Sequence, residues 1–84
     1  MTYFVYAILS SKCNWIYVGL TNDVPRRIKE HNLGRNHSTK AYAPFRLLFY
    51  EEYPSRMEAR IREKYLKSAA GKRWIYKNWL CGPV

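Results

Sequence analysis

Residues 3–20 read YFVYAILSSKCNWIYVGL, and they carry the clearest indication of the fold. Residues 3–9 form a continuous run of aromatic, aliphatic and β-branched side chains, which is typical of a central strand covered on both faces. Residues 10–14 are polar and turn-like, and residues 15–20 form a second β-prone run. The short gap between the two runs predicts an antiparallel hairpin.

The segment after the hairpin carries the signals of a helix start and a helix end. Residues 21–23 supply helix caps, Pro25 suits the first turn, and Gly34 is a natural residue just beyond a helix end. We therefore expect a helix over residues 24–33. Residues 35–44 are polar and are expected to form a mobile loop.

A third β-prone run and two further helices complete the chain. The run spans residues 45–53, with Phe45, Leu47 and Phe49 expected on one face. Ser55 and Glu58 fit the capping-box pattern S-x-x-E, which predicts that a long helix begins there. Its apolar stripe is expected to comprise Met57, Ile61, Tyr65 and Leu66.

Gly71 is expected to end this long helix. A short third helix over residues 72–80 is expected to pack through Trp74, Ile75 and Trp79. The resulting order, ββαβαα, predicts an α+β fold: a small three-stranded antiparallel sheet flanked by helices.

Composition limits the classes of function. The 84 residues allow a single domain over residues 1–84, and 48% hydrophobic and 17% aromatic content argues against disorder. Lys and Arg number 15 and Asp and Glu number 6, so the formal charge is +9. This charge favours an anionic partner. No run approaches the length of a membrane span, and no signal peptide is recognisable.

The two cysteines and two histidines indicate neither a disulfide framework nor a zinc finger. Cys13 and Cys81 form no C-x-x-C pair, and free thiols in a reducing, cytoplasmic setting are expected. The spacing of Cys13, His31, His37 and Cys81 matches no zinc-finger pattern.

Five polar residues suggest chemistry on a phosphodiester. Arg27 and His31 lie four residues apart on one helix face. Glu63 lies on the later helix, and Tyr6 and Tyr17 lie on the first two strands. One carboxylate can hold Mg²⁺, arginine binds phosphate through two parallel bonds, and a phenol or imidazole can take a proton from water. Each residue also has a structural explanation, since Glu63, for example, is an i, i+4 partner of Lys67.

In this order the residues form a known pattern. Phe4-Val5-Tyr6 and, about ten residues later, Tyr17-Val18-Gly19 are two strand motifs; the helix with Arg27 and His31 follows, and Glu63 comes last. On these motifs the chain resembles the GIY-YIG nuclease superfamily over nearly its whole length, and most closely its small stand-alone members. The resemblance implies the ββαβαα fold independently expected above.

The resemblance also implies roles for these residues. Tyr6 and Tyr17 would line the site, Arg27 would bind the scissile phosphate, and His31 would bond to a tyrosine or relay a proton. Glu63 would bind a single divalent metal, Mg²⁺ or Mn²⁺. Gly19 would let the backbone approach closely. The general base is left open between Tyr6, Tyr17 and His31.

Two positions bear on how closely the chain follows the family pattern. Phe4 replaces a glycine of the first motif, and we expect it to pack in the core. Asn78 is a candidate for an asparagine that the family places beyond the glutamate, or else lies on an exposed helix face.

Contacts to DNA are expected from Arg26, Lys40 and Lys67. Aromatic residues near the loop and the C-terminus either stack on unpaired bases or fill the core. They are Tyr42, Trp74, Tyr76 and Trp79.

The sequence favours a DNA endonuclease with one divalent metal, directed by DNA shape rather than sequence and acting in repair or recombination. Branched or unpaired DNA is a candidate substrate, with a partner protein or a dimer as a source of specificity. The alternatives are a nucleic-acid-binding module of the same fold with little or no turnover, and a domain whose basic face binds an acidic protein.

Overall fold

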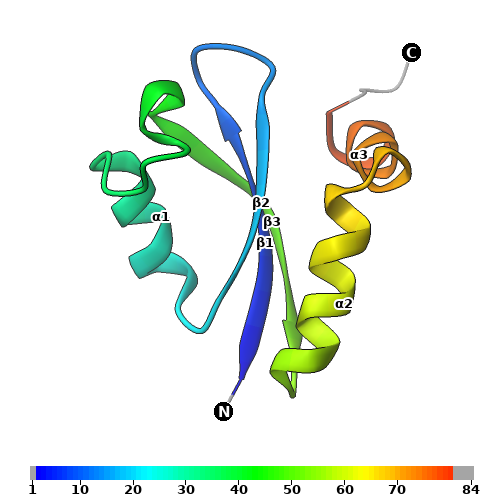
Figure 1. The fold of residues 1–84 in the computed structure, drawn as a ribbon. Helices are drawn as coiled ribbons and strands as arrows, with labels where there is room; N and C mark the ends of the chain where they lie inside the picture. The colour runs from blue at the N-terminus through cyan, green and yellow to red at the C-terminus, as the bar shows by residue number, and fades with distance from the viewer. Residues whose placement is uncertain (1, 81–84) are drawn as a thin grey trace.

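Three antiparallel strands form the sheet in the computed structural model, which describes residues 2–80. They are β1 (Tyr3–Ser10), β2 (Ile16–Thr21) and β3 (Phe45–Tyr53), in the order β2-β1-β3. β1 pairs antiparallel with both neighbours, and its residues 5–10 are buried (Figure 1). The predicted hairpin and central strand are therefore confirmed.

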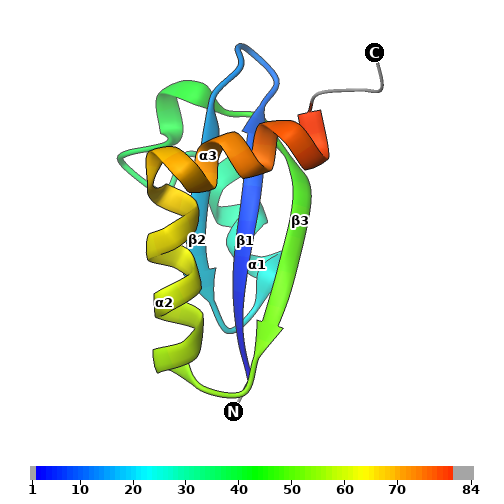
Figure 2. The same cartoon turned by 90° about the vertical axis from the view of Figure 1, so that its right-hand side faces the viewer.

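Helices cover both faces of the sheet. Helix α1 (Val24–Asn32) lies on one face, while α2 (Arg56–Lys67) and α3 (Ala69–Ile75) lie on the other (Figures 1 and 2). A short 3₁₀ helix, η1 (Lys40–Tyr42), precedes β3, and a π-helical turn, η2 (Tyr76–Leu80), follows α3. The expected α+β class and the order ββαβαα are confirmed. Within residues 2–80, no helix has the length and apolar character needed to cross a membrane.

The predicted helix caps are present. The Asp23 side chain accepts a hydrogen bond from the backbone N–H of Arg26 at 3.1 Å, and Ser55 Oγ accepts one from Glu58 at 3.3 Å. Gly34 has φ +76°, the left-handed conformation that glycine adopts without a steric cost. These local signals set where α1 and α2 begin and where α1 ends.

Alternation along β1 divides the core in two. Val5, Ala7 and Leu9 point to the α2 and α3 face, where they pack with Leu66 and Ile75 among others. Residues Tyr6 and Ile8 point to the α1 face, where they pack with Phe45. The α1 face thus contains the first of the predicted site residues.

The prediction that Phe45, Leu47 and Phe49 share one face was wrong. Phe45 packs on the α1 face and Phe49 on the α2 face. The cause is an irregularity in the β1–β3 register, where Ala7 pairs with Phe49 and the next residue of β1 pairs with Leu47. One extra residue of β3 at this bulge reverses the inward and outward positions.

The predicted apolar stripe of α2 was also largely wrong. Met57 is 75% exposed and Ile61 is 66% exposed, whereas Ala59 and Leu66 are buried with Glu63. The small side chain of Ala59 lets the helix approach the sheet closely, and the 59-63-66 spacing forms the inner face. The larger apolar residues Met57, Ile61 and Tyr65 therefore face outward.

Gly71 does not end the long helix as predicted. α2 ends at Lys67, and Ser68 Oγ caps α3 by accepting a hydrogen bond from the Gly71 N–H at 3.1 Å. A Cβ at Gly71 would overlap the backbone of Tyr65 and Leu66. Glycine is needed here because α3 crosses so near the end of α2.

The expected third helix over residues 72–80 is in fact α3 followed by η2. Ile75 is buried, and Trp74 packs against the core below the Arg62 guanidinium, which lies 4.9 Å from the ring centroid. Trp79 stacks on Phe49 at 5.0 Å but is 48% exposed. These three residues therefore pack as predicted, Trp79 only in part.

Residues 35–44, which are expected to form a polar loop, include one short helical element. They contain η1 and the buried Thr39, and the Ala43–Pro44 peptide bond is cis. In the turn between β1 and β2, Cys13 is an exposed free thiol. Cys81 lies outside the described residues. Residues 2–80 contain no group of three or more His, Cys, Asp or Glu side chains that would hold a metal ion.

Candidate active site

A buried hydrogen bond between Tyr6 and His31 lies on the α1 face of the sheet. The Tyr6 hydroxyl and His31 Nε2 are 2.8 Å apart, and both side chains are almost fully buried. His31 reaches this position because it lies in the last turn of α1, on the side of the helix that faces the sheet. Arg27 lies one turn earlier on the same side.

A second hydrogen bond joins the other ring nitrogen of His31 to Thr39. Thr39 Oγ1 is 2.8 Å from His31 Nδ1, and it also donates to the carbonyl oxygen of Asn36 at 3.4 Å. A hydroxyl has only one proton, so with that proton on the Asn36 carbonyl oxygen, Thr39 would accept from the Nδ1–H group. His31 Nε2 is then free of a proton and accepts from the Tyr6 hydroxyl.

Burial keeps both partners neutral. It lowers the pKa of His31 to about 4, helped by the positive charge of Arg27. Burial, together with the neighbouring Tyr17, raises the pKa of Tyr6 to about 12, against the opposing effect of Arg27. At neutral pH the phenol therefore keeps its proton, and the imidazole next to it is free to accept one.

Tyr17 extends this pair toward the edge of the sheet. Its ring centroid is 5.0 Å from that of His31 and 6.4 Å from that of Tyr6. On its other side, Lys67 Nζ lies 5.7 Å from the centre of the Tyr17 ring. Because Lys67 belongs to α2, this contact connects the two faces of the sheet across β2.

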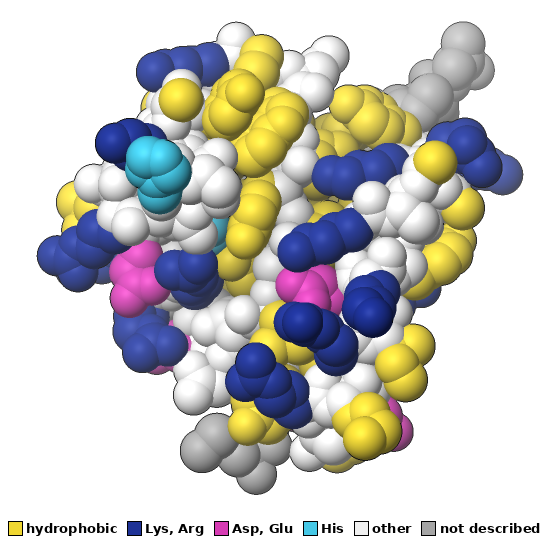
Figure 3. Space-filling model, in the orientation of Figure 1, with side chains coloured by type: hydrophobic (Ala, Val, Ile, Leu, Met, Phe, Trp, Pro, Cys, Tyr) yellow, Lys and Arg dark blue, Asp and Glu magenta, His cyan; other side chains and the backbone are white. Residues whose placement is uncertain are grey.

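Glu63 reaches the same edge from α2. It is only 7% exposed, with Oε2 3.1 Å from Lys67 Nζ and Oε1 3.4 Å from Arg60 Nη1. Its charge is close enough to contribute to the raised pKa of Tyr6. Figure 3 views the molecule from the β2 edge, where an acidic side chain over α2 lies among Lys and Arg side chains.

Arg27 lies half-buried on α1 and is paired with Glu30, with Nη1 3.0 Å from Oε1. The hydrogen bond from Arg27 lowers the pKa of Glu30. Arg27 also lines a polar pocket of about 430 Å³ together with Arg26 and Arg56. Three guanidinium groups around one pocket suit phosphate oxygens.

Gly19 lies directly across the hairpin from Tyr6. A Cβ at this position would overlap the hydroxyl and the ring of Tyr6. The missing side chain therefore leaves the space in which the phenol reaches His31. The predicted close approach at Gly19 takes place against Tyr6 itself.

The structure brings Tyr6, Tyr17, Arg27, His31 and Glu63 close together, as the resemblance implied. Lys67 joins them through its ion pair with Glu63. Arg26 is exposed beside the polar pocket and bonds to Asn22 at 3.0 Å, and Lys40 is exposed at the start of η1.

Phe4 and Asn78, the two positions that bear on the family pattern, each contact another residue of the protein. Phe4 is half-buried and packs edge-on against the exposed Tyr50, with ring centroids 5.7 Å apart, so the prediction that it packs in the core was wrong. Asn78 is exposed and donates a hydrogen bond to the carbonyl oxygen of Trp74. Of the described residues, Thr39 was missed in the sequence, because nothing in a polar loop marks one threonine as the partner of His31.

The chain also matches a known protein family over almost its whole length. The family model of the GIY-YIG catalytic domain matches residues 2–77. The chain belongs to the GIY-YIG family. A GIY-YIG domain implies nuclease-type activity on a nucleic-acid substrate, generally with a divalent metal.

Several relatives of this GIY-YIG protein carry the name UPF0213 protein. YazA of Bacillus subtilis is 35% identical over 72 residues, covering 84% of this chain and 72% of YazA. CPE1444 of Clostridium perfringens is 38% identical over 65 residues, covering 76% of this chain and 69% of CPE1444. The solution structure of BH0048 from Bacillus halodurans is 34% identical, with a TM-score of 0.58, covering 99% of this chain and 89% of that one.

The donor set fits one divalent cation of the GIY-YIG type. Glu63 supplies a nearly buried carboxylate, and Mg²⁺ is commonly held by one or two carboxylates together with water and substrate phosphate. Both oxygens of Glu63 already face cationic groups, so the position favours positive charge. Arg60 and Lys67 are about half exposed, at 58% and 47%, so their side chains have room to turn away.

The buried His31 predicts a pH dependence of stability for this GIY-YIG domain. The unfolded chain protonates this imidazole below its ordinary pKa of 6.5, whereas the folded protein resists protonation until about pH 4. The unfolded state thus binds more protons between these values, so the free energy of unfolding should fall by at most about 3 kcal/mol as the pH drops from 6.5 to 4.

Urea unfolding at a series of pH values measures this effect. Subtracting the profile of His31→Gln from that of the wild type should remove the contribution of the carboxylates and leave the slope due to His31. The exposed His37, changed to Gln, is the matched control and should keep the wild-type slope. A wild-type slope in His31→Gln would contradict the assignment.

Proposed function

We propose that this protein is a metal-dependent DNA endonuclease that hydrolyses phosphodiester bonds. The observation that carries the proposal is the buried hydrogen bond of Tyr6 to a neutral His31, with Arg27 and Glu63 close by. Mg²⁺ or Mn²⁺ on Glu63 would stabilise the charge that develops on the phosphate and the leaving oxygen. Action in repair or recombination, a choice of DNA by shape, and a cytoplasmic location belong to the same proposal.

Arg27 would hold the scissile phosphate. Its guanidinium can donate two parallel hydrogen bonds to phosphate oxygens, and it would exchange its bond to Glu30 for these. The phosphate would also offset the positive charge of Arg27, which is one cause of the low pKa of His31. Substrate binding therefore makes His31 a better proton acceptor at the moment when one is needed.

Tyr6 and His31 would then act as a relay. As the water oxygen bonds to phosphorus, a water proton would move to the Tyr6 hydroxyl oxygen and the Tyr6 proton to His31 Nε2. One P–O ester bond would break with its electron pair on the leaving oxygen, which would then take a proton from solvent. With a pKa of about 12, Tyr6 alone is a poor base at neutral pH, so the acceptor nitrogen 2.8 Å away is what makes it useful. In this scheme Tyr17 positions the water and the ring of His31.

One observation favours a second candidate, a nucleic-acid-binding module without turnover. Glu63 is paired with Lys67 and Arg60, and Arg27 is paired with Glu30, so the groups needed for metal and phosphate have partners within the protein. In that case the basic surface would bind nucleic acid independently of metal. A partner protein or a dimer that adds specificity is compatible with either candidate.

Cleavage of supercoiled plasmid, flap and branched DNA tests the proposal. Cleavage should require Mg²⁺ or Mn²⁺ and stop in EDTA. Arg27→Ala should lower the rate by about 10²- to 10³-fold, the loss typical for a donor that stabilises transition-state charge. Arg46→Ala, which removes an exposed arginine of β3, should cleave at the wild-type rate. Absence of cleavage on every DNA would refute the nuclease and favour the binding module, whereas equal rates for Arg27→Ala and wild type would refute the assignment of cleavage to this site.

A further inference from the structure

An aromatic ladder leads from the candidate active site to the surface. It consists of Tyr17, Trp15 and Tyr42. The ring centroid of Tyr17 lies 6.2 Å from that of Trp15, and Trp15 stacks on Tyr42 at 4.1 Å with an angle of 16° between the rings. Tyr42 is 36% exposed, so the outer end of the ladder is open to solvent.

Two hydrogen bonds hold the outer end of this ladder in place. Ser10 Oγ donates to the carbonyl oxygen of Tyr42 at 2.6 Å, and the N–H of Ser11 donates to that of Pro44 at 2.8 Å. Both bonds attach the segment around η1 to the end of β1. The Tyr42 ring is therefore positioned before any ligand arrives, which reduces the entropy lost on binding.

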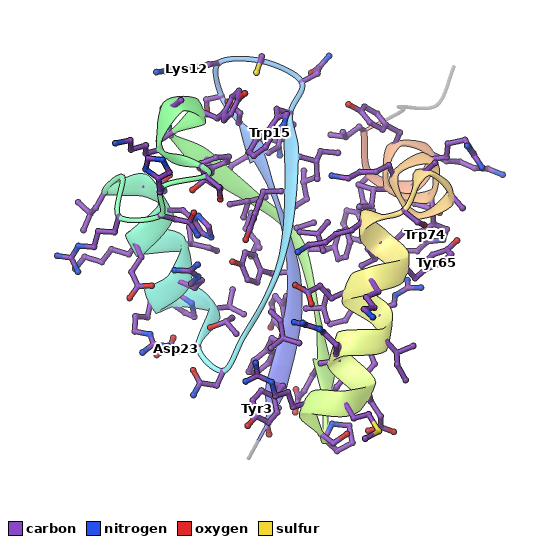
Figure 4. All side chains as sticks on the ribbon, in the orientation of Figure 1. Tyr3, Lys12, Trp15, Asp23, Tyr65 and Trp74 are labelled. Carbon is purple, nitrogen blue, oxygen red and sulfur yellow. The ribbon has the colours of Figure 1, made fainter. Side chains whose placement is uncertain are left out.

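Cationic side chains lie along the ladder. Lys67 Nζ lies over Tyr17, and Lys72 Nζ donates to the carbonyl oxygen of Ile16 at 2.9 Å. Lys40 adjoins Tyr42 on η1. Figure 3 shows a hydrophobic stripe running down this face with basic side chains on both sides, and in Figure 4 the labelled Lys12 and Trp15 lie at the same end of the molecule.

Other aromatic residues do not share this arrangement. Tyr50 is exposed on β3 against Phe4, Trp74 packs below Arg62, and Trp79 stacks on Phe49. In Figure 4 the labelled Tyr65 and Trp74 lie toward α2 and α3, away from the hairpin end. Of the exposed aromatic rings among residues 2–80, Tyr42 is thus the one whose stacking chain ends at Tyr17 and His31.

We propose that Trp15 and Tyr42 bind an unpaired base next to the cleaved phosphate, so that the substrate is DNA with a single-stranded or branched segment. The inference rests on the proposed function, because it takes the nucleic acid to be the partner of the site. Bases of any sequence stack on aromatic rings, whereas the bases of an intact duplex are covered by their neighbours. The surrounding lysines would hold the backbone of the same strand.

Binding measured in EDTA separates this inference from catalysis. The probes are fluorescein-labelled oligothymidine and a hairpin duplex of equal length, followed by anisotropy. Tyr42→Leu should weaken oligothymidine binding at least about fivefold, since stacking contributes about 1–3 kcal/mol per base, and should change duplex binding less than about twofold. Tyr42→Phe keeps the ring and should bind both probes like the wild type. Tyr50→Leu, which removes a more exposed tyrosine, is the matched control and should also leave both affinities unchanged.

A second measurement needs only the wild-type protein. A 2-aminopurine base within the oligothymidine should lose fluorescence when the protein binds, because stacking quenches it. Fluorescence that stays bright in the bound strand overturns the inference. The inference is also overturned if Tyr42→Leu binds both probes like the wild type, or if its affinity for both probes falls equally. If the wild-type protein shows metal-dependent cleavage, any of these three results refutes the stacking site alone. Failure to bind either probe, together with absence of cleavage, refutes the proposed function as well.

Discussion

Glu63→Gln is expected to lower metal-dependent cleavage at least about a thousandfold, which corresponds to about 4 kcal/mol of lost transition-state stabilisation. The amide has the shape of the carboxylate but no charge, so it is a poor ligand for a hard divalent cation. The protein should remain folded, because the lost ion pairs join Glu63 to side chains that are about half exposed, and such pairs contribute about 0.2–1 kcal/mol each.

Initial rates of plasmid nicking over a range of Mg²⁺ concentrations measure the effect, with thermal unfolding as the test of folding. Glu58→Gln is the matched control, because Glu58 is an exposed carboxylate at the start of the same helix and should not affect the rate. Lys67→Ala shows whether Glu63 acts only by anchoring Lys67. An equal loss in Lys67→Ala, or an unchanged rate in Glu63→Gln, would contradict the role of Glu63 as a metal ligand.

Gly19→Ala should disable the site through a single methyl group. The added carbon would overlap the ring and hydroxyl of Tyr6, and Tyr6 is almost fully buried, so the ring has little space to move into. We expect the hydrogen bond to His31 to break and cleavage to fall about a hundredfold, the loss that a displacement of about 1 Å can cause. Overpacking of this kind should also cost about 1–3 kcal/mol of stability.

Gly34→Ala is the matched control for this substitution. A Cβ at Gly34 meets nothing closer than 3.7 Å, so the change costs stability through the left-handed backbone alone, about 1–2 kcal/mol. Comparing cleavage rates at similar stability therefore isolates the displacement of Tyr6. If both variants cleave at the same rate, the space at Gly19 has no part in positioning Tyr6.

Local signals in the sequence predicted much of the fold. Asp23, Ser55 and Gly34 mark helix ends through hydrogen bonds and backbone conformations that involve only a few neighbouring residues, and such effects are visible in a short stretch of sequence. The continuous apolar run of β1 likewise required a position between two covered faces. The five site residues that the resemblance implied also lie close together in the structure, and their roles in chemistry stay predictions.

The errors arose where contacts between distant segments decide the outcome. α2 has two possible inner faces, and the pattern of large apolar residues favoured the one containing Met57 and Ile61. The structure uses the face with Ala59 and Leu66, since a small side chain allows close approach to the sheet. Similarly, the bulge in β3 depends on its pairing with β1, so the opposite orientations of Phe45 and Phe49 were not visible in β3 alone.

The order of elements, the helix ends and the residues available for chemistry could be predicted from the sequence, because these depend on spacing and on local hydrogen bonds. The chemical state of the site depends on the folded protein. The pKa values of Tyr6 and His31 depend on burial, and the tautomer of His31 depends on Thr39, a residue from a separate loop. Burial and long-range hydrogen bonding exist only once the chain has folded.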